Sequence, residues 1–473
     1  MSKVYLAADF GGGSGRVIAG WIEDGKLIME EVHRFGNRQV RLDEHVYWDF
    51  PALFEDMKAG LKKAAAKGHQ VESIGVDTWG VDFGLIDRDG QLIGNPVCYR
   101  DARTAGMTEK LFEQINPTEH YATTGIQVME INTLAQLLSI KGTAQLESAH
   151  RLLFMPDLFS YFLTGKATNE YCIASTSELL DAKRRDWSWE TIEALGLPKH
   201  IFGEIVMPGT VRGELRKDIA EETGLGDVKV IAVGSHDTAS AVAAVPAIEG
   251  DGPVAFLSSG TWSLLGLELP EPILTEEARK AEFTNEGGVG GRIRFLQNIT
   301  GLWIMQRLMA EWKERGEEQT FAQILPAAEQ ANISSIIPVA DAAFMNPSSM
   351  EQAICDYCKQ SNQQVPQTKG ELVRCVLLSL ATKYREAING ISGIMPEKPK
   401  RLHIIGGGSQ NDLLNQYTAD ALGIPVWAGP VEATAMGNIL VQAMASGEIA
   451  DMGELREVVR RSVTPKVFEP QKA

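Results

Sequence analysis

The turn at residues 11–16, which reads GGGSGR, has the composition of a phosphate-binding loop. It follows Asp9 at the end of an apolar run, and glycines there let backbone N–H groups approach an anion without obstruction by a Cβ atom. Three consecutive glycines are more than a hairpin turn requires. The sequence therefore favours an anion cradle over a plain hairpin. Asp9 either holds a metal ion bound to that phosphate or caps the turn.

Two further turns of small residues have similar chemistry. Residues 258–261 read SSGT, whose hydroxyls can reach a terminal phosphate, and residues 406–408 are glycines between a short apolar run and a helical pattern. The N-terminus of such a helix favours an anion or a nucleotide. Any one of these turns is common, but three in one chain predict a single nucleotide held between two domains. The chain has no GxxxxGK[ST] string, and GGGSQN lacks the last glycine of the dinucleotide fingerprint, so another binding scheme is required.

Asp237 is the candidate general base. In the segment GSHDTASAVAAV, we expect Ser235 to cap a helix whose first turn holds Asp237, where the helix dipole favours the ionised carboxylate. An ionised carboxylate can accept a proton, although an Asp at this position more often only stabilises its helix. His236 beside it either positions a substrate or fills a polar gap.

A sugar pocket is indicated by the segment VDTWGVDFGLID, predicted as a strand, a turn and a strand. An apolar wall beside fixed polar groups is a common way to hold a small molecule, so Trp79 and Gly80 are candidates for that pocket. A tryptophan buried in the core is the alternative. Asn298 and Gln306 are expected about two turns apart on one helix, facing either the ligand or solvent.

Two similar halves are predicted to position these residues. Each half opens with a hairpin whose tip is rich in glycine and hydroxyl groups, and continues as a mixed α/β pattern. The segment VPAIEGDGP, residues 245–253, interrupts the pattern near the midpoint with two prolines and two glycines. We therefore place the domain boundary there, between residues 1–246 and residues 247–473. The expected fold is a duplicated α/β domain around a cleft.

Composition restricts the classes of partner. The 473 residues are 44% hydrophobic and 23% charged, an ordinary globular mixture. The net charge of −17 opposes binding to nucleic acid and to anionic membranes. No run of about 18 apolar residues predicts a membrane span, and no signal peptide is recognised, so we expect a cytoplasmic protein.

The five cysteines are few, odd in number and scattered, which favours reduced thiols. Cys355 and Cys358 have a CxxC spacing, but no second pair completes a zinc site. Cys358 and Cys375 can meet if the stretch between them folds back. A helix-borne thiol without a partner is the favoured interpretation.

Taken together, these motifs resemble the FGGY family of carbohydrate kinases, within the sugar kinase, actin and hsp70 superfold. The segments resemble, in order and over nearly the whole chain, the branch of that family that phosphorylates L-rhamnulose. The segments are VDTWGVDFGLID, PVCYRDARTAG, MPDLFSYFLTGK, SHDTASAV, LSSGTWSLLG, TNEGGVGG, NITGLWIMQR, LHIIGGGSQNDLLNQ and AGPVEATAMGNI. The resemblance implies two actin-like (ribonuclease H-like) α/β domains, each with a central mixed sheet, flanking a cleft between them. It implies sugar and phosphate binding by the first domain and nucleotide binding by the second.

The resemblance also implies an activity, namely phosphorylation of L-rhamnulose on its carbon-1 hydroxyl by ATP with Mg²⁺, between an isomerase and an aldolase in L-rhamnose breakdown. Asp237 is the implied proton acceptor, and Asp9 approaches the metal through phosphate or water. The implied substrate contacts are Trp79, Gly80, His236, Asp237, Thr238 and Asn298. The implied ATP contacts are Gly12, Gly13, Ser14, Gly15, Arg16, Thr261, Gln306 and Gly407. Relatives often have a hydroxyl residue in place of one glycine of the first turn, so fewer side-chain contacts to phosphate are expected here.

Three other functions compete with this expectation. L-fuculose or L-ribulose is the nearest alternative substrate. A catalytically silent sugar sensor with the same fold is a different class, and the presence of both Asp9 and Asp237 argues against it. A nicotinamide dehydrogenase is rejected because Pro425, Val426 and Trp427 stand about 20 residues after GGGSQN, where that class has an acidic residue.

Overall fold

The computed structural model describes residues 3–247, 250, 252–345, 347–395 and 397–471. Three residues of the expected boundary segment, 248, 249 and 251, lie outside the described residues. The chain divides into two compact units. The first comprises Met1–Pro246, Leu269–Phe295 and Ala433–Ser462, and the second comprises Ala247–Glu268, Leu296–Glu432 and Val463–Ala473.

The first unit is built on a six-stranded mixed sheet with the order β13-β14-β6-β1-β2-β3. Strands β1, β6 and β14 are parallel, whereas β2, β3 and β13 run antiparallel to their neighbours. The strands are β1 (Val4–Phe10), β2 (Ser14–Glu23), β3 (Lys26–Gly36), β6 (Val71–Asp77), β13 (Val211–Glu214) and β14 (Lys229–Ile231). The expected hairpin is confirmed, and Asp24 and Gly25 between β2 and β3 both have positive φ, as a tight two-residue turn requires.

Helix α1 (Phe50–Ala66) covers one face of this sheet. Its N-cap Asp49 accepts a hydrogen bond from the backbone N–H of Ala52, and Leu53, Met57 and Leu61 follow at intervals of one turn and are buried. Their spacing places them on one stripe, which packs in the same core as the strand residues. The remaining helices between β3 and β14 are α2 (Met107–Phe112), α3 (Pro117–Thr124), α4 (Thr133–Ser139), α5 (Ala144–Ser148), α6 (Met155–Thr164), α7 (Tyr171–Ser175), α8 (Trp189–Ala194) and α9 (Lys217–Thr223).

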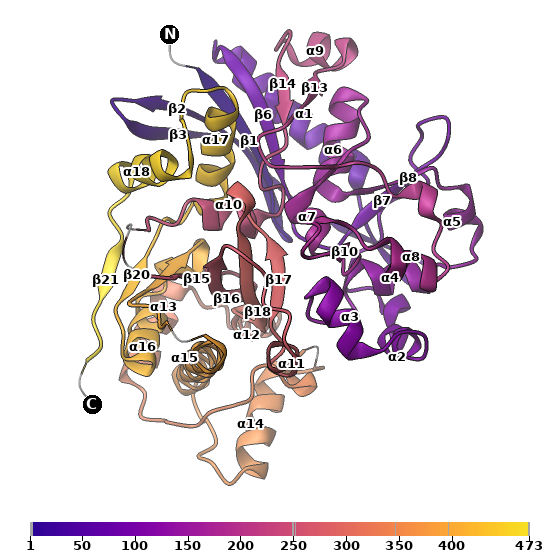
Figure 1. Ribbon diagram of the computed structural model, residues 1–473. Coiled ribbons are helices and arrows are strands. Elements are labelled where there is room, and N and C mark those ends of the chain that lie inside the picture. The colour runs from indigo at the N-terminus through magenta and orange to yellow at the C-terminus, as the bar shows by residue number, and fades with distance from the viewer. Residues whose placement is uncertain (1–2, 248–249, 251, 346, 396, 472–473) are drawn as a thin grey trace. The chain divides into compact units, whose positions relative to one another are not determined.

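Segments from the end of the chain pack on its beginning within the first unit. Figure 1 shows α17 (Ala433–Ala445) and α18 (Met452–Ser462), drawn in yellow, beside the indigo strands β1 to β3. A Cβ atom on Gly20 would lie 2.6 Å from Ile439 Cδ1, and one on Gly75 would lie 2.5 Å from Asn438 Oδ1. Glycines in β2 and β6 therefore allow α17 to approach the sheet closely.

Four short ribbons of two strands complete the first unit. They are β4 (Gln39–Leu42) with β5 (His45–Trp48), β7 (Phe83–Ile86) with β8 (Arg151–Phe154), β9 (Asn169–Glu170) with β12 (Ile205–Val206), and β10 (Leu180–Asp181) with β11 (Asp186–Trp187). The stretch 269–295 adds α11 (Glu276–Lys280), β17 (Thr284–Gly287) and the first residues of β18 (Ile293–Thr300). The strand, turn and strand expected of VDTWGVDFGLID are confirmed as β6 and β7.

The second unit repeats the arrangement of the first. Its sheet runs β18-β16-β15-β19-β20-β21, and the hairpin of β15 and β16 is again followed by parallel strands, β19 and β20. The strands are β15 (Val254–Ser259), β16 (Trp262–Leu269), β19 (Leu402–Ile405), β20 (Val426–Ala428) and β21 (Lys466–Phe468). The helices are α12 (Trp303–Glu314), α13 (Phe321–Gln330), α14 (Met350–Gln360), α15 (Lys369–Ile394) and α16 (Asp412–Leu422). The predicted pair of hairpin-led mixed α/β halves is confirmed.

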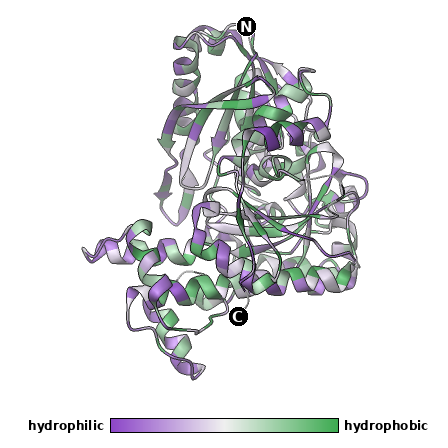
Figure 2. Cartoon of the chain, turned by 90° about the vertical axis from the view of Figure 1, so that its left-hand side faces the viewer, coloured by the Kyte–Doolittle hydropathy of each residue, from purple (hydrophilic) through white to green (hydrophobic). Residues whose placement is uncertain are grey.

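The helices are amphipathic rather than uniformly apolar. Figure 2 shows green and purple residues alternating along them, the pattern of helices with one buried and one solvated face. None of the helices in the described ranges combines the length and the hydrophobicity needed to cross a membrane.

All five cysteines are free thiols, as the sequence predicts. Cys358 on α14 and Cys375 on α15 are both buried, and burial raises the pKa of both thiols. Each thiol also acts on the pKa of the other, so the two helices bring them close together. Both remain free, so the interpretation of Cys358 as a helix-borne thiol without a disulfide partner is confirmed.

Candidate active site

The candidate base Asp237 is the first residue of α10 (Asp237–Ala243). The residue at the N-cap is His236, not Ser235 as expected, and no side chain caps this helix end. Ser235 instead has a φ of +53°, and its carbonyl accepts a hydrogen bond from the backbone N–H of Thr78. The left-handed residue turns the chain so that residue 236 pairs with residue 78 next to the end of β6. This turn places Asp237 at the end of a central strand.

The Asp237 carboxylate is held through one of its two oxygens. The backbone N–H and the hydroxyl of Thr238 donate to Oδ1 at 2.6 and 3.1 Å, and His236 Nε2 lies 3.4 Å from the same atom. The side chain is 32% exposed. Thr434 on α17 donates its hydroxyl to the Asp237 carbonyl at 3.2 Å, which fixes the backbone as well. The carboxylate is therefore oriented yet open to a ligand.

A second carboxylate, Asp77, lies behind α10 at the end of β6. It is fully buried and accepts hydrogen bonds from Ser240 Oγ and Asn438 Nδ2, both at 2.7 Å. Burial raises the pKa of Asp77 well above its usual range, and the nearby charges of Asp9 and Asp237 raise it further. Asp77 therefore links α10 to α17 through these two hydrogen bonds.

Asp9 stands beside Asp77, because β1 and β6 are parallel and pair these two residues. Arg16 on β2 donates to Asp9 Oδ2 from Nη2 at 2.9 Å. A Cβ atom on Gly12 or Gly13 would meet nothing within 4 Å, so the tip of this turn is open. The structure thus places the predicted phosphate turn next to the strand ends that carry Asp9 and Asp77.

Gly80 and Trp79 have different surroundings. A Cβ atom on Gly80 would lie 3.4 Å from His236 Nε2, so Gly80 leaves space beside that nitrogen. Trp79 is only 7% exposed, and its indole N–H donates to Asp82 Oδ2 at 2.9 Å. Burial raises the pKa of Asp82 to about 6, although Trp48 Nε1 also donates to it. Gly80 therefore lies with His236 and Asp237, whereas Trp79 belongs to a buried polar cluster.

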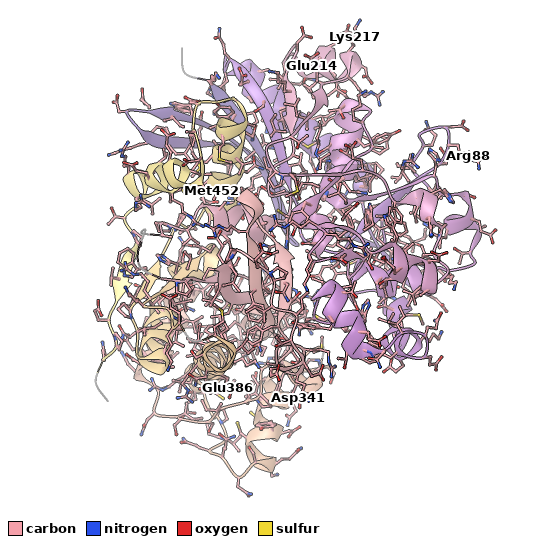
Figure 3. All side chains as sticks on the ribbon, in the orientation of Figure 1. Arg88, Glu214, Lys217, Asp341, Glu386 and Met452 are labelled. Carbon is pink, nitrogen blue, oxygen red and sulfur yellow. The ribbon has the colours of Figure 1, made fainter. Side chains whose placement is uncertain are left out.

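Charged side chains normally lie at the surface, as the five labelled ionic side chains in Figure 3 do. Those five are exposed: Arg88, Glu214, Lys217, Asp341 and Glu386. Arg294 and Glu286 differ, because both are buried and contact His236 within the first unit. Sequence reasoning assigned them no role. An arginine within the otherwise apolar run IRFL of a strand was the available signal.

In the second unit, the two predicted turns meet. A Cβ atom on Gly408 would lie 2.0 Å from Ser259 Oγ, so the turn after β19 packs directly on the end of β15. Gly407 is different, because a Cβ atom there would meet nothing within 4 Å. Thr261 donates its hydroxyl to Gln306 Oε1 at 3.2 Å. The predicted ATP contacts Thr261 and Gln306 are therefore neighbours, and Gly407 lies at an open position.

The expectation that Asn298 and Gln306 share a helix is wrong. Asn298 lies on β18 and Gln306 on α12. Gly301 lies between the two elements and passes close to the backbone of Trp262. A Cβ atom on Gly301 would lie only 2.7 Å from that backbone, so the position has no room for a side chain. This close approach ends the strand and turns the chain into the helix.

The comparisons with known proteins identify the class. Residues 4–244 match the N-terminal domain of the FGGY family of carbohydrate kinases, and residues 255–446 match its C-terminal domain. The chain belongs to this family, and it is a carbohydrate kinase. The resemblance expected from the sequence motifs is confirmed.

Curated relatives narrow the family to one branch. The chain is 45% identical to a rhamnulokinase of Bacteroides thetaiotaomicron, over 100% of this chain and 96% of that protein. It is 42% identical to a rhamnulokinase of Oceanobacillus iheyensis, covering 98% of this chain and 97% of the relative. The identity to a rhamnulokinase of Bacillus subtilis is 39%, covering 99% and 96%.

Solved structures agree on the fold. The gluconate kinase of Lactobacillus acidophilus superposes with a TM-score of 0.81 at 16% identity, covering 100% of this chain and 94% of that one. A ligand-bound xylulose kinase of the same organism has a TM-score of 0.81 at 17% identity, covering 99% and 94%. The expected two-domain fold with mixed sheets is confirmed.

Proposed function

We propose that this protein transfers the γ-phosphoryl group of ATP to the carbon-1 hydroxyl of L-rhamnulose, giving L-rhamnulose 1-phosphate and ADP. The rhamnulokinase relatives, at 39–45% identity over nearly the whole chain, support this substrate. The observation that carries the chemistry is the oriented, partly exposed carboxylate of Asp237. Neither L-fuculose nor L-ribulose is favoured by these relatives.

The proposed base acts through the second carboxylate oxygen of Asp237. Within the described residues, the hydrogen bonds and the histidine contact of this carboxylate all involve Oδ1. Oδ2 then accepts the proton of the carbon-1 hydroxyl while the hydroxyl oxygen forms a bond to the γ-phosphorus. The bond from that phosphorus to the bridging oxygen breaks, and ADP leaves. Alignment of the hydroxyl is the main contribution of the protein in such a transfer.

Small residues are proposed to hold the nucleotide, and polar residues the sugar. Backbone N–H groups at open turns approach phosphate without obstruction by a Cβ atom, which supports the turns that contain Gly12 and Gly407. The proposed ATP contacts are Gly12, Gly13, Ser14, Gly15, Arg16, Thr261, Gln306 and Gly407. The proposed sugar contacts are Trp79, Gly80, His236, Asp237, Thr238 and Asn298. We keep the division into a sugar- and phosphate-binding domain, residues 1–246, and a nucleotide-binding domain, residues 247–473, as part of this proposal.

Asp9 is the residue proposed to approach Mg²⁺. The described residues contain no group of three or more His, Cys, Asp or Glu side chains placed to hold a metal ion. Mg²⁺ usually keeps several waters and is held by one or two carboxylates together with substrate phosphates, so a single carboxylate such as Asp9 suits it. When bound with ATP, the ion neutralises charge on the phosphoryl oxygens. Asp9 stands at the open glycine turn and is held by Arg16, so its carboxylate is already oriented there.

We place the reaction in the cytoplasm. Five free cysteines support a reducing compartment, where disulfides are rare. ATP, the proposed phosphoryl donor, is also supplied there.

The test is ADP formation from MgATP with L-rhamnulose, L-fuculose, L-ribulose and D-xylulose under one set of conditions, with the product identified by ³¹P NMR. We expect a strong preference for L-rhamnulose and a carbon-1 phosphate ester. Preference for another ketose would overturn the proposed substrate and retain the kinase class. A sugar sensor would bind a ketose in calorimetry and release no ADP.

A further inference from the structure

Arg294 on β18 is a buried arginine whose guanidinium is engaged at all three nitrogens. Its exposed fraction is 0%. Nε donates to the Gly287 carbonyl at 2.8 Å, Nη1 lies 3.0 Å from Glu286 Oε2, and Nη2 lies 3.1 Å from His236 Nδ1. Burying a guanidinium is costly unless its partners compensate. The carbonyl and carboxylate offset that cost, and the contact with His236 is the one that leads to the candidate base.

The contact with Arg294 selects one tautomer of His236. A guanidinium has only N–H donors, so His236 Nδ1 must accept the hydrogen bond. A neutral imidazole whose Nδ1 is an acceptor carries its proton on Nε2. Glu286 Oε2 lies 3.5 Å from the same Nδ1 and would favour the opposite tautomer. However, Glu286 is paired with Arg294, and Arg294 is closer to Nδ1.

The selected proton faces the reaction site. His236 Nε2 lies 3.4 Å from Asp237 Oδ1, and Gly80 leaves the space beside this nitrogen free of a side chain. An N–H there can donate to an oxygen of a sugar whose neighbouring hydroxyl is held by Asp237. The opposite tautomer would place a lone pair there, facing the carboxylate.

We propose that Arg294 is a positioning residue that fixes His236 with its proton on Nε2, so that this N–H donates to a ketose oxygen next to the reacting hydroxyl. The inference rests on the proposed function for the identity of the ketose, and on the structure alone for the tautomer. Glu286 assists by neutralising and orienting the guanidinium. Neither Arg294 nor Glu286 touches the substrate.

The tautomer is measured directly in the full-length protein. We would label the histidines with ¹⁵N and record long-range ¹H–¹⁵N correlations without ligand, using His236→Gln to assign the signals of His236. The expected result is an acceptor-type Nδ1 and a protonated Nε2. A protonated Nδ1 would overturn the inference.

Kinetics test whether Arg294 acts through His236. For Arg294→Lys, whose single ammonium cannot make all three contacts, we expect the KM for L-rhamnulose to rise at least ten-fold and the KM for ATP to change less than two-fold. Arg292→Lys is the matched control, since Arg292 is exposed two residues earlier and should leave both constants unchanged. In a His236→Ala background, Arg294→Lys should have no further effect on the KM for the sugar. If the two substitutions together raise the KM for the sugar by the product of their separate effects, the inference is overturned.

If Arg294→Lys does not fold, a second variant that removes the positive and the negative buried charge together can be used instead. The double substitution Glu286→Gln with Arg294→Gln removes both buried charges together and keeps polar side chains. It should fold, mix the two tautomers of His236 and raise the KM for the sugar. An unchanged tautomer and an unchanged KM would show that the pair is only structural. If the wild type phosphorylates no ketose, the proposed function fails and the tautomer measurement still decides the inference.

Discussion

The two units differ in the chemistry of the candidate site residues that each contains. In the first unit, the ionisable side chains of Arg294, His236 and Asp237 contact one another in that order, and Asp77 is bonded to the helix of Asp237 through Ser240. In the second unit, the predicted nucleotide contacts come from turns of small residues and one pair of neutral side chains, Thr261 and Gln306. Proton transfer needs groups of controlled charge, whereas phosphate can be held by backbone N–H groups. The predictions below test this contrast.

The largest effect is expected where charge is essential. Asp237→Asn removes the proton acceptor and keeps the shape of the side chain, so kcat should fall by about 10³-fold or more. The binding of ATP and L-rhamnulose, measured by calorimetry, should remain within a few-fold of the wild type. Asp227→Asn is the matched control, because it makes the same chemical change at an exposed residue. Near-normal turnover in Asp237→Asn would remove the assignment of the base.

The next largest effect tests the packing of α17 against α10, the helix that begins with Asp237. Gly437→Ala places a Cβ atom 1.8 Å from the Ser240 carbonyl oxygen, where α17 crosses α10. Because backbone must move to relieve this overlap, the free energy of unfolding should fall by about 3 kcal/mol. Urea denaturation measures the loss. Gly393→Ala on α15 is the control, since its Cβ atom meets nothing within 4 Å and should not destabilise the protein. Equal stability of the two variants would contradict the close helix crossing.

Two adjacent glycines in the second unit, Gly407 and Gly408, test how its turn contributes to packing and to nucleotide binding. Gly408→Ala would overlap Ser259, so we expect a loss of about 1–3 kcal/mol in the free energy of unfolding. Gly407→Ala has room for its methyl group and should leave stability nearly unchanged, but raise the KM for ATP several-fold if phosphate approaches this backbone. Thermal unfolding and ATP titration of both variants distinguish packing from binding. An unchanged KM for ATP in Gly407→Ala would remove Gly407 from the nucleotide site.

The smallest effect is a change in the pH dependence of stability. The unfolded chain releases the proton of Asp77 near pH 4, whereas the folded protein keeps it to a higher pH, because burial raises the pKa. The folded state then binds more protons, so this group lowers stability as pH rises from about 4 through the folded pKa. Asp77→Asn cannot titrate, so its stability relative to the wild type should increase over that range. Urea denaturation across the range measures the slope, and a parallel slope for both proteins would contradict a raised pKa of Asp77. Asp227→Asn should follow the wild type.

Local patterns in the sequence were enough to predict the two hairpins, because glycine turns between apolar runs determine them over a few residues. The position of Ser235 was not predictable in the same way. Its side chain suits a helix cap, but its backbone is needed for a left-handed turn that bonds to residue 78. Asn298 was placed on the wrong element because Gly301, two residues before the helix, ends the strand through contact with a distant backbone.

The partners of the site residues were beyond local reasoning. Asn438 reaches Asp77 across 361 positions of sequence, and Arg294 reaches His236 across 58. No spacing within either segment predicts such pairs. The clusters of functional residues were visible as motifs, whereas the side chains that hold them in place depend on the tertiary fold.

The discontinuous first unit determines the order in which the protein can be completed during synthesis. The stretch 269–295 brings Arg294 and Glu286, and the stretch 433–462 brings Asn438 and Thr434. When only residues 1–246 have been synthesised, Asp237 lacks all four of these supports. The unit becomes whole only after residue 462 has been synthesised. Activity on the sugar therefore cannot precede the synthesis of residue 462, and a gene fragment that stops at residue 246 encodes the base without its supports.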